Sequence, residues 1–147
     1  EISLLFSIIN ILHRFPNSSY LLPNEINEYN YNDKYNFIFL SSNQTNYINK
    51  NSIDIAFNTM SFQEMSLHEI TKYFILLRKV MKKNNFFYCM NAVEKEMIVG
   101  DNKFFVRFNE YPWNNNDKIF KYNLSDVHKN MTIKPFFRKI VRLETNE

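Results

Sequence analysis

A helix signature between two apolar runs dominates the middle of this sequence. Ser66 and Glu69 have the S-x-x-E spacing of a capping box, which satisfies free backbone N–H groups at a helix start. Apolar residues then recur at helical spacing: Leu67, Ile70, Phe74, Leu77 and Met81. The flanking runs Ile53–Phe57 and Phe86–Met90 are mainly apolar, which is typical of strands covered on both faces. This order predicts a βαβ unit whose two strands lie parallel.

Charge marks the expected end of this helix. Four cations crowd its last predicted turn, where they suit the helix dipole: Arg78, Lys79, Lys82 and Lys83. Asn84-Asn85 follows, and asparagine is the commonest residue besides glycine that adopts the left-handed conformation closing a helix. We therefore expect this asparagine pair to cap the helix.

The remaining segments extend an α/β pattern. Ile2–Phe15 indicates a helix that Pro16 stops. Four further segments are predicted strands: Ser19–Leu22, Phe37–Leu40, Phe104–Phe108 and Thr132–Leu143. We interpret Glu94–Lys103 as a mobile loop. The predicted fold class is α/β, in one domain over residues 1–147, with a mostly parallel sheet and antiparallel strands at its C-terminal edge.

The amino-acid composition argues against several classes of protein. The formal net charge is only +3 and the basic residues are spread along the chain, which disfavours a nucleic-acid-binding surface. Cys89 is the only cysteine, so an internal disulfide and a Cys-based zinc cage are excluded, as fits a reducing cytoplasm. The apolar run Ile2–Ile9 is well short of the ~20 residues of a membrane span. Because the chain starts at Glu1 directly before this run, we expect it to be a fragment.

Polar residues follow the predicted parallel strands. They lie in Leu40–Gln44, in Asn58–Glu64 and at Asn91, and most carry amides or hydroxyls. In open α/β sheets, ligands bind outside the carboxyl ends of the strands. The pattern therefore predicts a cleft for a neutral polar ligand at this end of the sheet.

Several of these segments together resemble a known family. The matching stretches are Asn-Ser-Ile-Asp-Ile-Ala-Phe-Asn-Thr (51–59), Ser-Phe-Gln-Glu-Met (61–65), Tyr73-Phe74, Leu77-Arg78-Lys79, Asn85–Asn91, Tyr111-Pro112-Trp113 and Arg142-Leu143. The sequence resembles the sugar O-methyltransferases, over roughly residues 37–143 and most specifically over 51–91. The resemblance implies a class I, Rossmann-like methyltransferase sheet that binds S-adenosylmethionine (SAM) and methylates a sugar hydroxyl. It also implies a role in polysaccharide biosynthesis.

The chain departs from the family at the cofactor site. The family grips SAM with a glycine-rich turn after its first strand, but Gly100 is the only glycine here and falls in a late loop. If Phe37–Leu40 is the third strand of the family's sheet, its first two strands are missing and Ile53–Phe57 loses a neighbour. We expect an incomplete Rossmann-like sheet that closes the gap by a new pairing or exposes apolar strand edges. We also expect this fragment to be inactive alone.

The resemblance assigns cofactor and substrate contacts. It places Asn43 and Gln44 where an acidic residue often contacts the adenine, and it puts Asn58 and Thr59 beside SAM. The substrate contacts it implies are Ser61, Phe62, Asn91 and Trp113. Trp113 could instead be a core plug beside its neighbouring proline.

Glu64 and His68 are the candidate catalytic residues. Glu64 could be a base or a substrate clamp, although an acid before a helix also complements the helix dipole. His68 could take a proton from a sugar hydroxyl, or it could be an ordinary exposed histidine. We assign no metal ligands, because the sequence offers no convincing set of carboxylates and histidines.

Two other functions stay open at this point. The first is a degenerate Rossmann-like domain without catalysis, which would have a structural or protein-interaction role. A weaker one is a basic nucleic-acid-binding domain.

Overall fold

The computed structural model describes residues 2–27, 34–125 and 135–145 and divides the chain into two compact units. One unit is Glu1–Asn49 and the other is Lys50–Glu147. The predicted strand Thr132–Leu143 begins outside the described residues, since 132–134 are not among them. The expectation of a single domain stays a prediction.

The first unit contains one long helix and a minimal sheet. Its elements, in chain order, are α1 (Ile2–Arg14), β1 (Tyr20–Leu21), the 3-10 helix Pro23–Glu25, β2 (Phe37–Ile38) and the 3-10 helix Ser42–Tyr47. β1 and β2 pair in parallel, with Tyr20 opposite Phe37. The helix and both strands predicted here are confirmed, but each strand is only two residues long.

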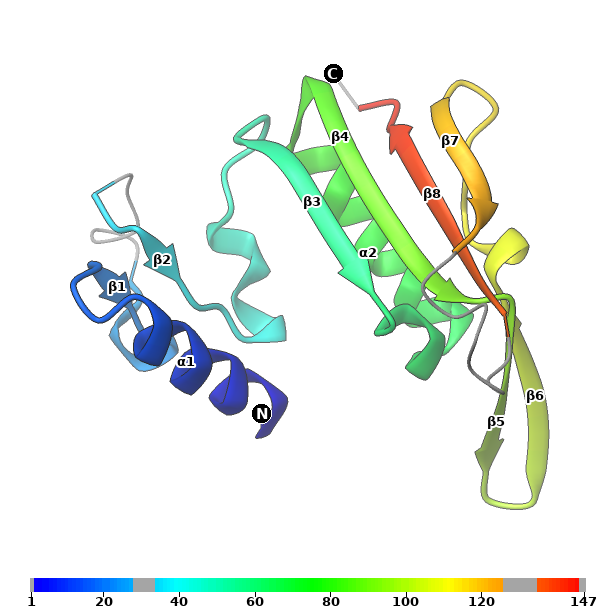
Figure 1. Cartoon of the computed structure of the whole chain (residues 1–147), viewed down its shortest axis with the longest axis horizontal. Coiled ribbons are helices and arrows are strands. Elements are labelled where there is room, and N and C mark those ends of the chain that lie inside the picture. The colour runs from blue at the N-terminus through cyan, green and yellow to red at the C-terminus, as the bar shows by residue number, and fades with distance from the viewer. Residues whose placement is uncertain (1, 28–33, 126–134, 146–147) are drawn as a thin grey trace. The chain divides into compact units, whose positions relative to one another are not determined.

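The second unit contains the main sheet, in which four strands are ordered β3-β4-β8-β7 (Figure 1). Their bounds are Ile53–Thr59 for β3, Met81–Ala92 for β4, Phe136–Arg142 for β8 and Lys118–Leu124 for β7. β3 and β4 are parallel, whereas β8 is antiparallel to both of its neighbours, β4 and β7. The predicted α/β class with antiparallel C-terminal strands is confirmed, but the main sheet is mixed rather than mostly parallel, with one parallel and two antiparallel pairings.

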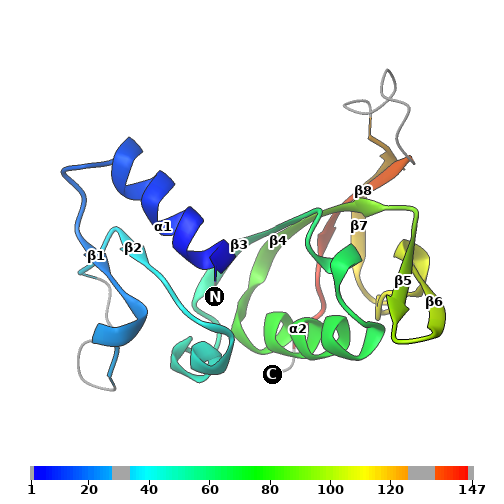
Figure 2. The same ribbon diagram turned by 90° about the horizontal axis from the view of Figure 1, so that it is seen from below.

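Helix α2 (Leu67–Val80) joins the two parallel strands and covers one face of the sheet (Figure 2). Its start is as predicted, because the Ser66 hydroxyl accepts a hydrogen bond from the backbone N–H of Glu69 at 3.2 Å. The Glu69 carboxylate pairs with Lys72 at 2.7 Å. The apolar stripe faces the sheet, where Ile70 and Phe74 are fully buried.

The end of α2 differs from the prediction. The helix stops at Val80 and Met81 is already extended, with φ −78°, so Asn84-Asn85 is not a left-handed cap. Asn85 lies within β4, completely buried. Its amide donates to the Leu143 carbonyl at 3.0 Å and accepts from the Leu143 N–H at 2.9 Å. This asparagine therefore ties β4 to the residues that follow β8.

Aromatic rings fill the space between α2, the sheet and the loop 108–113. Phe74 lies at the centre, with ring centroids 4.9 Å from Trp113 and 5.8 Å from Phe87, both in edge-to-face geometry. Phe62 and Phe108 pack around the same cluster and are nearly or fully buried. This core fixes the loops at the carboxyl ends of the parallel strands.

A β-hairpin replaces the loop predicted at Glu94–Lys103. It consists of β5 (Glu94–Val99) and β6 (Asn102–Arg107), with Gly100 at its turn in the left-handed region (φ +60°). Ion pairs cross the hairpin from Glu94 to Arg107 at 2.7 Å and from Glu96 to Lys103 at 2.9 Å. Charge on β5 hid the first strand of the hairpin from an apolar-run criterion, whereas β6 overlaps the strand predicted at Phe104–Phe108 and confirms it. β7 was missed for the same reason.

β3 lies at the edge of the four-stranded sheet. Among the described residues it pairs only with β4, and Ile55 and Phe57 are 53% and 74% exposed. β2, the other predicted parallel strand, belongs to a separate sheet. Among the described residues the outer edge of β3 is thus unpaired, as one of the two expected alternatives requires.

Candidate functional site

The carboxyl ends of β3 and β4 meet at two asparagines. Asn58 and Asn91 are buried, and the Asn91 side-chain N–H donates to the Asn58 Oδ1 at 2.8 Å. The parallel register, with Asn58 opposite Cys89, brings the two amides to one edge of the sheet. The sequence placed both residues at strand ends, and the structure brings them together.

Gln63 connects this pair to the loop after β3. Its backbone N–H donates to the Asn91 Oδ1 at 3.1 Å, and its own Oε1 accepts from the Ala92 N–H at 2.7 Å. Its side-chain N–H reaches the Glu64 Oε1 at 3.1 Å. All three amides are largely satisfied within the chain, so they hold the strand ends in place. The substrate contact expected of Asn91 stays a prediction.

A strained turn follows β3 and positions Ser61. Met60 has φ +60°, which is costly for a bulky side chain and persists only where surrounding bonds impose it. Here the Met60 N–H donates to the Met90 carbonyl at 2.8 Å, and the Asn58 amide donates to the Ser61 hydroxyl at 2.5 Å. Strain of this kind clusters at functional sites. The exposed Ser61 hydroxyl is thereby held at the mouth of a groove.

This groove of about 250 Å³ runs between β3, the turn after it and α2. Its lining is mainly apolar, with polar atoms from Asn58, Ser61 and Tyr73. The full lining is Ala56, Phe57, Asn58, Ser61, Phe62, Met65, Tyr73, Leu76, Leu77 and Phe87. Of the predicted ligand contacts, Asn58, Ser61 and Phe62 therefore line one cavity. Thr59 is exposed at the end of β3.

Glu64 is the carboxylate among the candidate site residues. Its Oε1 accepts from the Gln63 amide and from the Lys95 ammonium, each at 3.1 Å. Partial burial raises the pKa of Glu64, but these two hydrogen bonds and the Lys95 charge outweigh that effect and lower it. The carboxylate is thus ionised at neutral pH and is better suited to accepting a hydrogen bond than to removing a proton. His68 is exposed in the first turn of α2.

Trp113 and Phe62 belong to the aromatic core. The Trp113 indole N–H donates to the Phe108 carbonyl at 3.1 Å, and the Lys139 ammonium lies 3.9 Å from its ring centroid. Only 4% of Phe62 is exposed. These contacts match the core-plug alternative for Trp113, and the substrate contacts predicted for both residues stay predictions.

Asn43 and Gln44 lie in the first unit, in the 3-10 helix that follows β2. The Gln44 Oε1 accepts from the Ser41 N–H at 3.0 Å, and its amide donates to the Pro23 carbonyl at 2.7 Å. Gln44 therefore stabilises a turn of its own unit. The adenine contacts assigned to this pair stay predictions.

Sequence reasoning missed Gln63 and Lys95 as parts of this site. Gln63 carries no signal beyond its place in the Ser-Phe-Gln-Glu-Met segment. Lys95 lies on β5, within the segment interpreted as a loop. In the described ranges, no three His, Cys, Asp or Glu side chains gather as metal ligands. Nor does any helix there have the length and apolar character needed to cross a membrane.

Cys89 lies beneath the asparagine pair and should be chemically silent. It is fully buried, the Asn91 amide donates to its Sγ at 3.3 Å, and burial raises the pKa of the thiol to about 12. We expect N-ethylmaleimide to label native Cys89 at least ~100-fold more slowly than the urea-unfolded chain, because both access and thiolate are lacking. Mass spectrometry of timed samples measures this ratio. Asn115→Cys, at an exposed loop position, is the control, and equally fast labelling of both thiols would contradict the buried site.

The described strands form an incomplete Rossmann-like α/β sheet. Among solved structures, a SAM-dependent methyltransferase from Leishmania major is similar, with a TM-score of 0.51 and 10% sequence identity. The match covers 71% of this chain and 44% of that protein, so the chain spans less than half of its length. At this identity the likeness establishes the fold alone. No protein-family model matches the sequence, and neither does any curated protein.

Proposed function

We propose that this chain is part of a SAM-dependent O-methyltransferase that acts on a sugar hydroxyl in polysaccharide biosynthesis. The observation that carries the proposal is the site at the carboxyl ends of β3 and β4, on a sheet of methyltransferase type. The resemblance of residues 51–91 to sugar O-methyltransferases supports the substrate class.

The groove fits only part of the cofactor. At about 250 Å³ it is smaller than the ~300–1,000 Å³ common for small-molecule pockets. Its amide and hydroxyl, from Asn58 and Ser61, suit the polar groups of a SAM-like ligand, while its apolar walls suit the remainder. SAM, when bound, supplies an electrophilic methyl group. Asn58 and Thr59 would hold the ligand on the side of β3, together with Ser61, which the sequence had indicated as a substrate contact.

Glu64 would orient the acceptor sugar. Methyl transfer depends mainly on the alignment of the acceptor oxygen, and it requires only a modest base. An ionised carboxylate can accept a hydrogen bond from the sugar hydroxyl and so direct the oxygen lone pair. His68, in the helix that follows, would receive the proton of the sugar hydroxyl.

We also propose that the chain alone is inactive. A purified and folded chain should give no detectable heat with S-adenosylhomocysteine in isothermal titration calorimetry, because the groove is too small and lacks a glycine-rich turn. The fluorescence of Trp113, the only tryptophan, verifies folding. Binding of S-adenosylhomocysteine with a micromolar Kd would contradict inactivity. In that case Ser61→Ala should weaken this binding more than Ser18→Ala, a control in the first unit.

The sequence encoded upstream of Glu1 tests the enzyme itself. An in-frame extension containing a strand and a glycine-rich turn would support the methyltransferase, and the extended protein should transfer labelled methyl groups to a sugar acceptor. A start codon immediately before Glu1 would oppose it. That outcome would favour a degenerate Rossmann-like domain with a structural or interaction role, which the internal bonding of Asn58 and Asn91 would also suit.

A further inference from the structure

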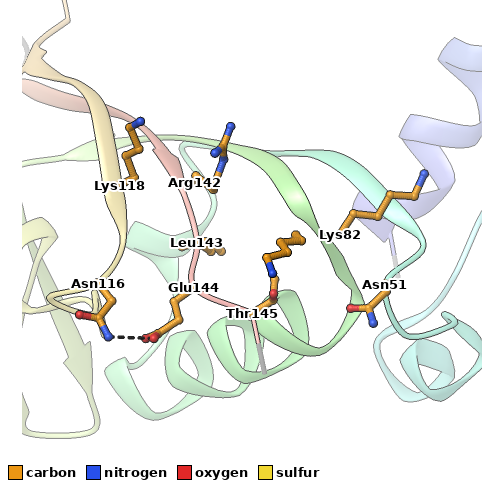
Figure 3. A pocket seen from close by; sticks show the side chains of 9 residues that line it. Asn51, Lys82, Asn116, Lys118, Arg142, Leu143, Glu144 and Thr145 are labelled. Atoms are coloured by element: carbon orange, nitrogen blue, oxygen red, sulfur yellow. Dashed lines mark hydrogen bonds between the residues drawn. The ribbon is translucent and has the colours of Figure 1, made fainter. Parts of the chain in front are cut away.

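A basic pocket lies at the opposite end of the sheet from the candidate site. It encloses about 670 Å³ where β3 and β4 begin, β8 ends and β7 begins (Figure 3). Its lining residues are Asn51, Lys82, Lys83, Asn116, Lys118, Arg142, Leu143, Glu144 and Thr145. The volume is within the ~300–1,000 Å³ common for small-molecule sites.

Positive charge predominates in this basic pocket. Four of its lining residues are cations, and the only carboxylate among them is Glu144. The Glu144 oxygens accept hydrogen bonds from the side-chain amides of Asn114 at 3.2 Å and Asn116 at 2.8 Å. Lys82 is paired with Asp54 at 2.9 Å, outside the lining. The net charge facing the pocket is therefore positive.

Two of the cations in the basic pocket, Lys118 and Arg142, are cross-strand neighbours. They lie directly opposite each other in the β7–β8 register, and both side chains extend in the same direction from the sheet (Figure 3). Like charges in this cross-strand position repel each other. No ion pair to either residue occurs within the described part of the chain. A bound anion would remove the repulsion.

The Arg142 guanidinium lies near two aromatic rings, and one of its nitrogens lacks a hydrogen-bond partner among the described residues. Its carbon lies 5.9 Å from the Phe86 ring centroid and 5.6 Å from that of Phe120, so two aromatic rings orient it. Its Nε is buried and has no hydrogen-bond partner among the described residues. Buried donors are normally paired, and guanidinium groups match phosphate oxygens well.

We propose that this basic pocket binds the phosphate group of a small phosphate ester. Arg142 and Lys118 contact the phosphate oxygens, while the rings of Phe86 and Phe120, outside the lining, hold the Arg142 guanidinium. Asn51, Asn116 and Thr145 supply neutral hydrogen-bonding groups at the rim. The proposal is independent of the methyltransferase function, because the two sites lie at opposite ends of the strands.

Nuclear magnetic resonance titrations of the whole chain test this site. Glucose 6-phosphate, inorganic phosphate and glucose would be added in turn, and the backbone amide signals of Lys118 and Arg142 followed. We expect saturable shifts with the phosphate ester and none with glucose. Equal affinity for inorganic phosphate would support the site and identify the free ion as a sufficient ligand. No saturable shift with either phosphate compound would overturn the proposal.

Charge-removing variants complete the test. Lys118→Gln and Arg142→Gln should each weaken ester binding about tenfold, as expected for one lost charge-assisted hydrogen bond. Lys121→Gln, an exposed cation on β7 outside the lining, should leave it unchanged. Equal weakening by Lys121→Gln would indicate nonspecific attraction and overturn the site. Tighter binding of single-stranded RNA, weakened equally by all three variants, would also overturn it in favour of a nucleic-acid surface.

Discussion

Replacing Arg78 with alanine should lower the free energy of unfolding by about 3–5 kcal/mol, the usual cost of breaking a buried ion pair. Arg78 makes two hydrogen bonds to the Asp117 carboxylate, at 2.7 and 2.9 Å, and both side chains are nearly inaccessible to water. It also donates to the carbonyls of Pro112 and Glu144. The alanine would leave the buried carboxylate without its counter-charge, and it would remove a donor from two carbonyls.

Urea denaturation followed by tryptophan fluorescence measures this loss. Lys72→Ala is the matched control on the same helix, because it removes a solvent-exposed ion pair and should leave the unfolding curve unchanged. If Arg78→Ala also left the curve unchanged, the buried ion pair would have no role in holding α2 to the loop at 112–117.

The Arg78 effect should shrink in acid. Burial raises the pKa of Asp117, but hydrogen bonds from Arg78 and from the N–H groups of Glu144 and Asn114 outweigh this and lower it. A depressed carboxyl pKa contributes stability that is complete above the ordinary value of ~3.9 and is lost as pH falls through the folded-state value. The difference between the wild-type chain and Arg78→Ala should therefore decrease below about pH 4. A difference that stayed constant with pH would contradict an ionised Asp117.

Truncating Phe74 to alanine should also cost about 3–5 kcal/mol, because it opens a cavity in the middle of the aromatic core. Phe74 is 1% exposed and contacts rings from the strand-end loop, from β4 and from the 108–113 loop. Loss of this side chain removes the contacts that hold those three segments together. Phe74→Leu, which keeps most of the volume, should cost only ~1–2 kcal/mol.

Urea midpoints for these variants give the comparison, with Ile75→Ala as the control. Ile75 is the next residue on α2 and is 59% exposed, so its truncation should change stability by about 0.5 kcal/mol or less. Circular dichroism reports whether Phe74→Ala still folds, and the leucine variant keeps the test informative if it does not. Equal costs at positions 74 and 75 would contradict the assigned face of α2.

Local patterns predicted the centre of the fold well. The cap at Ser66 and the apolar stripe from Leu67 to Leu77 are properties of the helix itself, although Met81 begins β4. The flanking apolar runs are the predicted strands, but the expectation that both of their faces are covered was wrong, because Ile55, Phe57 and Phe86 are exposed. The parallel register then followed from the short crossover. A helix or strand can be predicted from its own residues when several features of that segment, such as a cap and an apolar periodicity, agree.

Tertiary contacts decided what local patterns could not. Asn84-Asn85 has the chemistry of a helix cap, yet Asn85 extends into β4 because its amide bonds Leu143, far along the chain. β5 and β7 carry charge along their exposed faces, so they lack the apolar run that marked the other strands. At the site, strand ends were predicted from sequence, but the bonding of Gln63 depends on Asn91 and Ala92 from another strand.

The strand order has a consequence for how the chain acquires its structure. β8 follows β7 in sequence but lies between β4 and β7, so neither of those strands can complete its pairing before β8 has been synthesised. The hydrogen bonds of Arg78 are also completed late, because one of its acceptors is the carbonyl of Glu144, which follows β8. Contacts of such long sequence separation slow folding. During translation the βαβ unit would thus keep one edge of β4 unpaired until β8 has been synthesised.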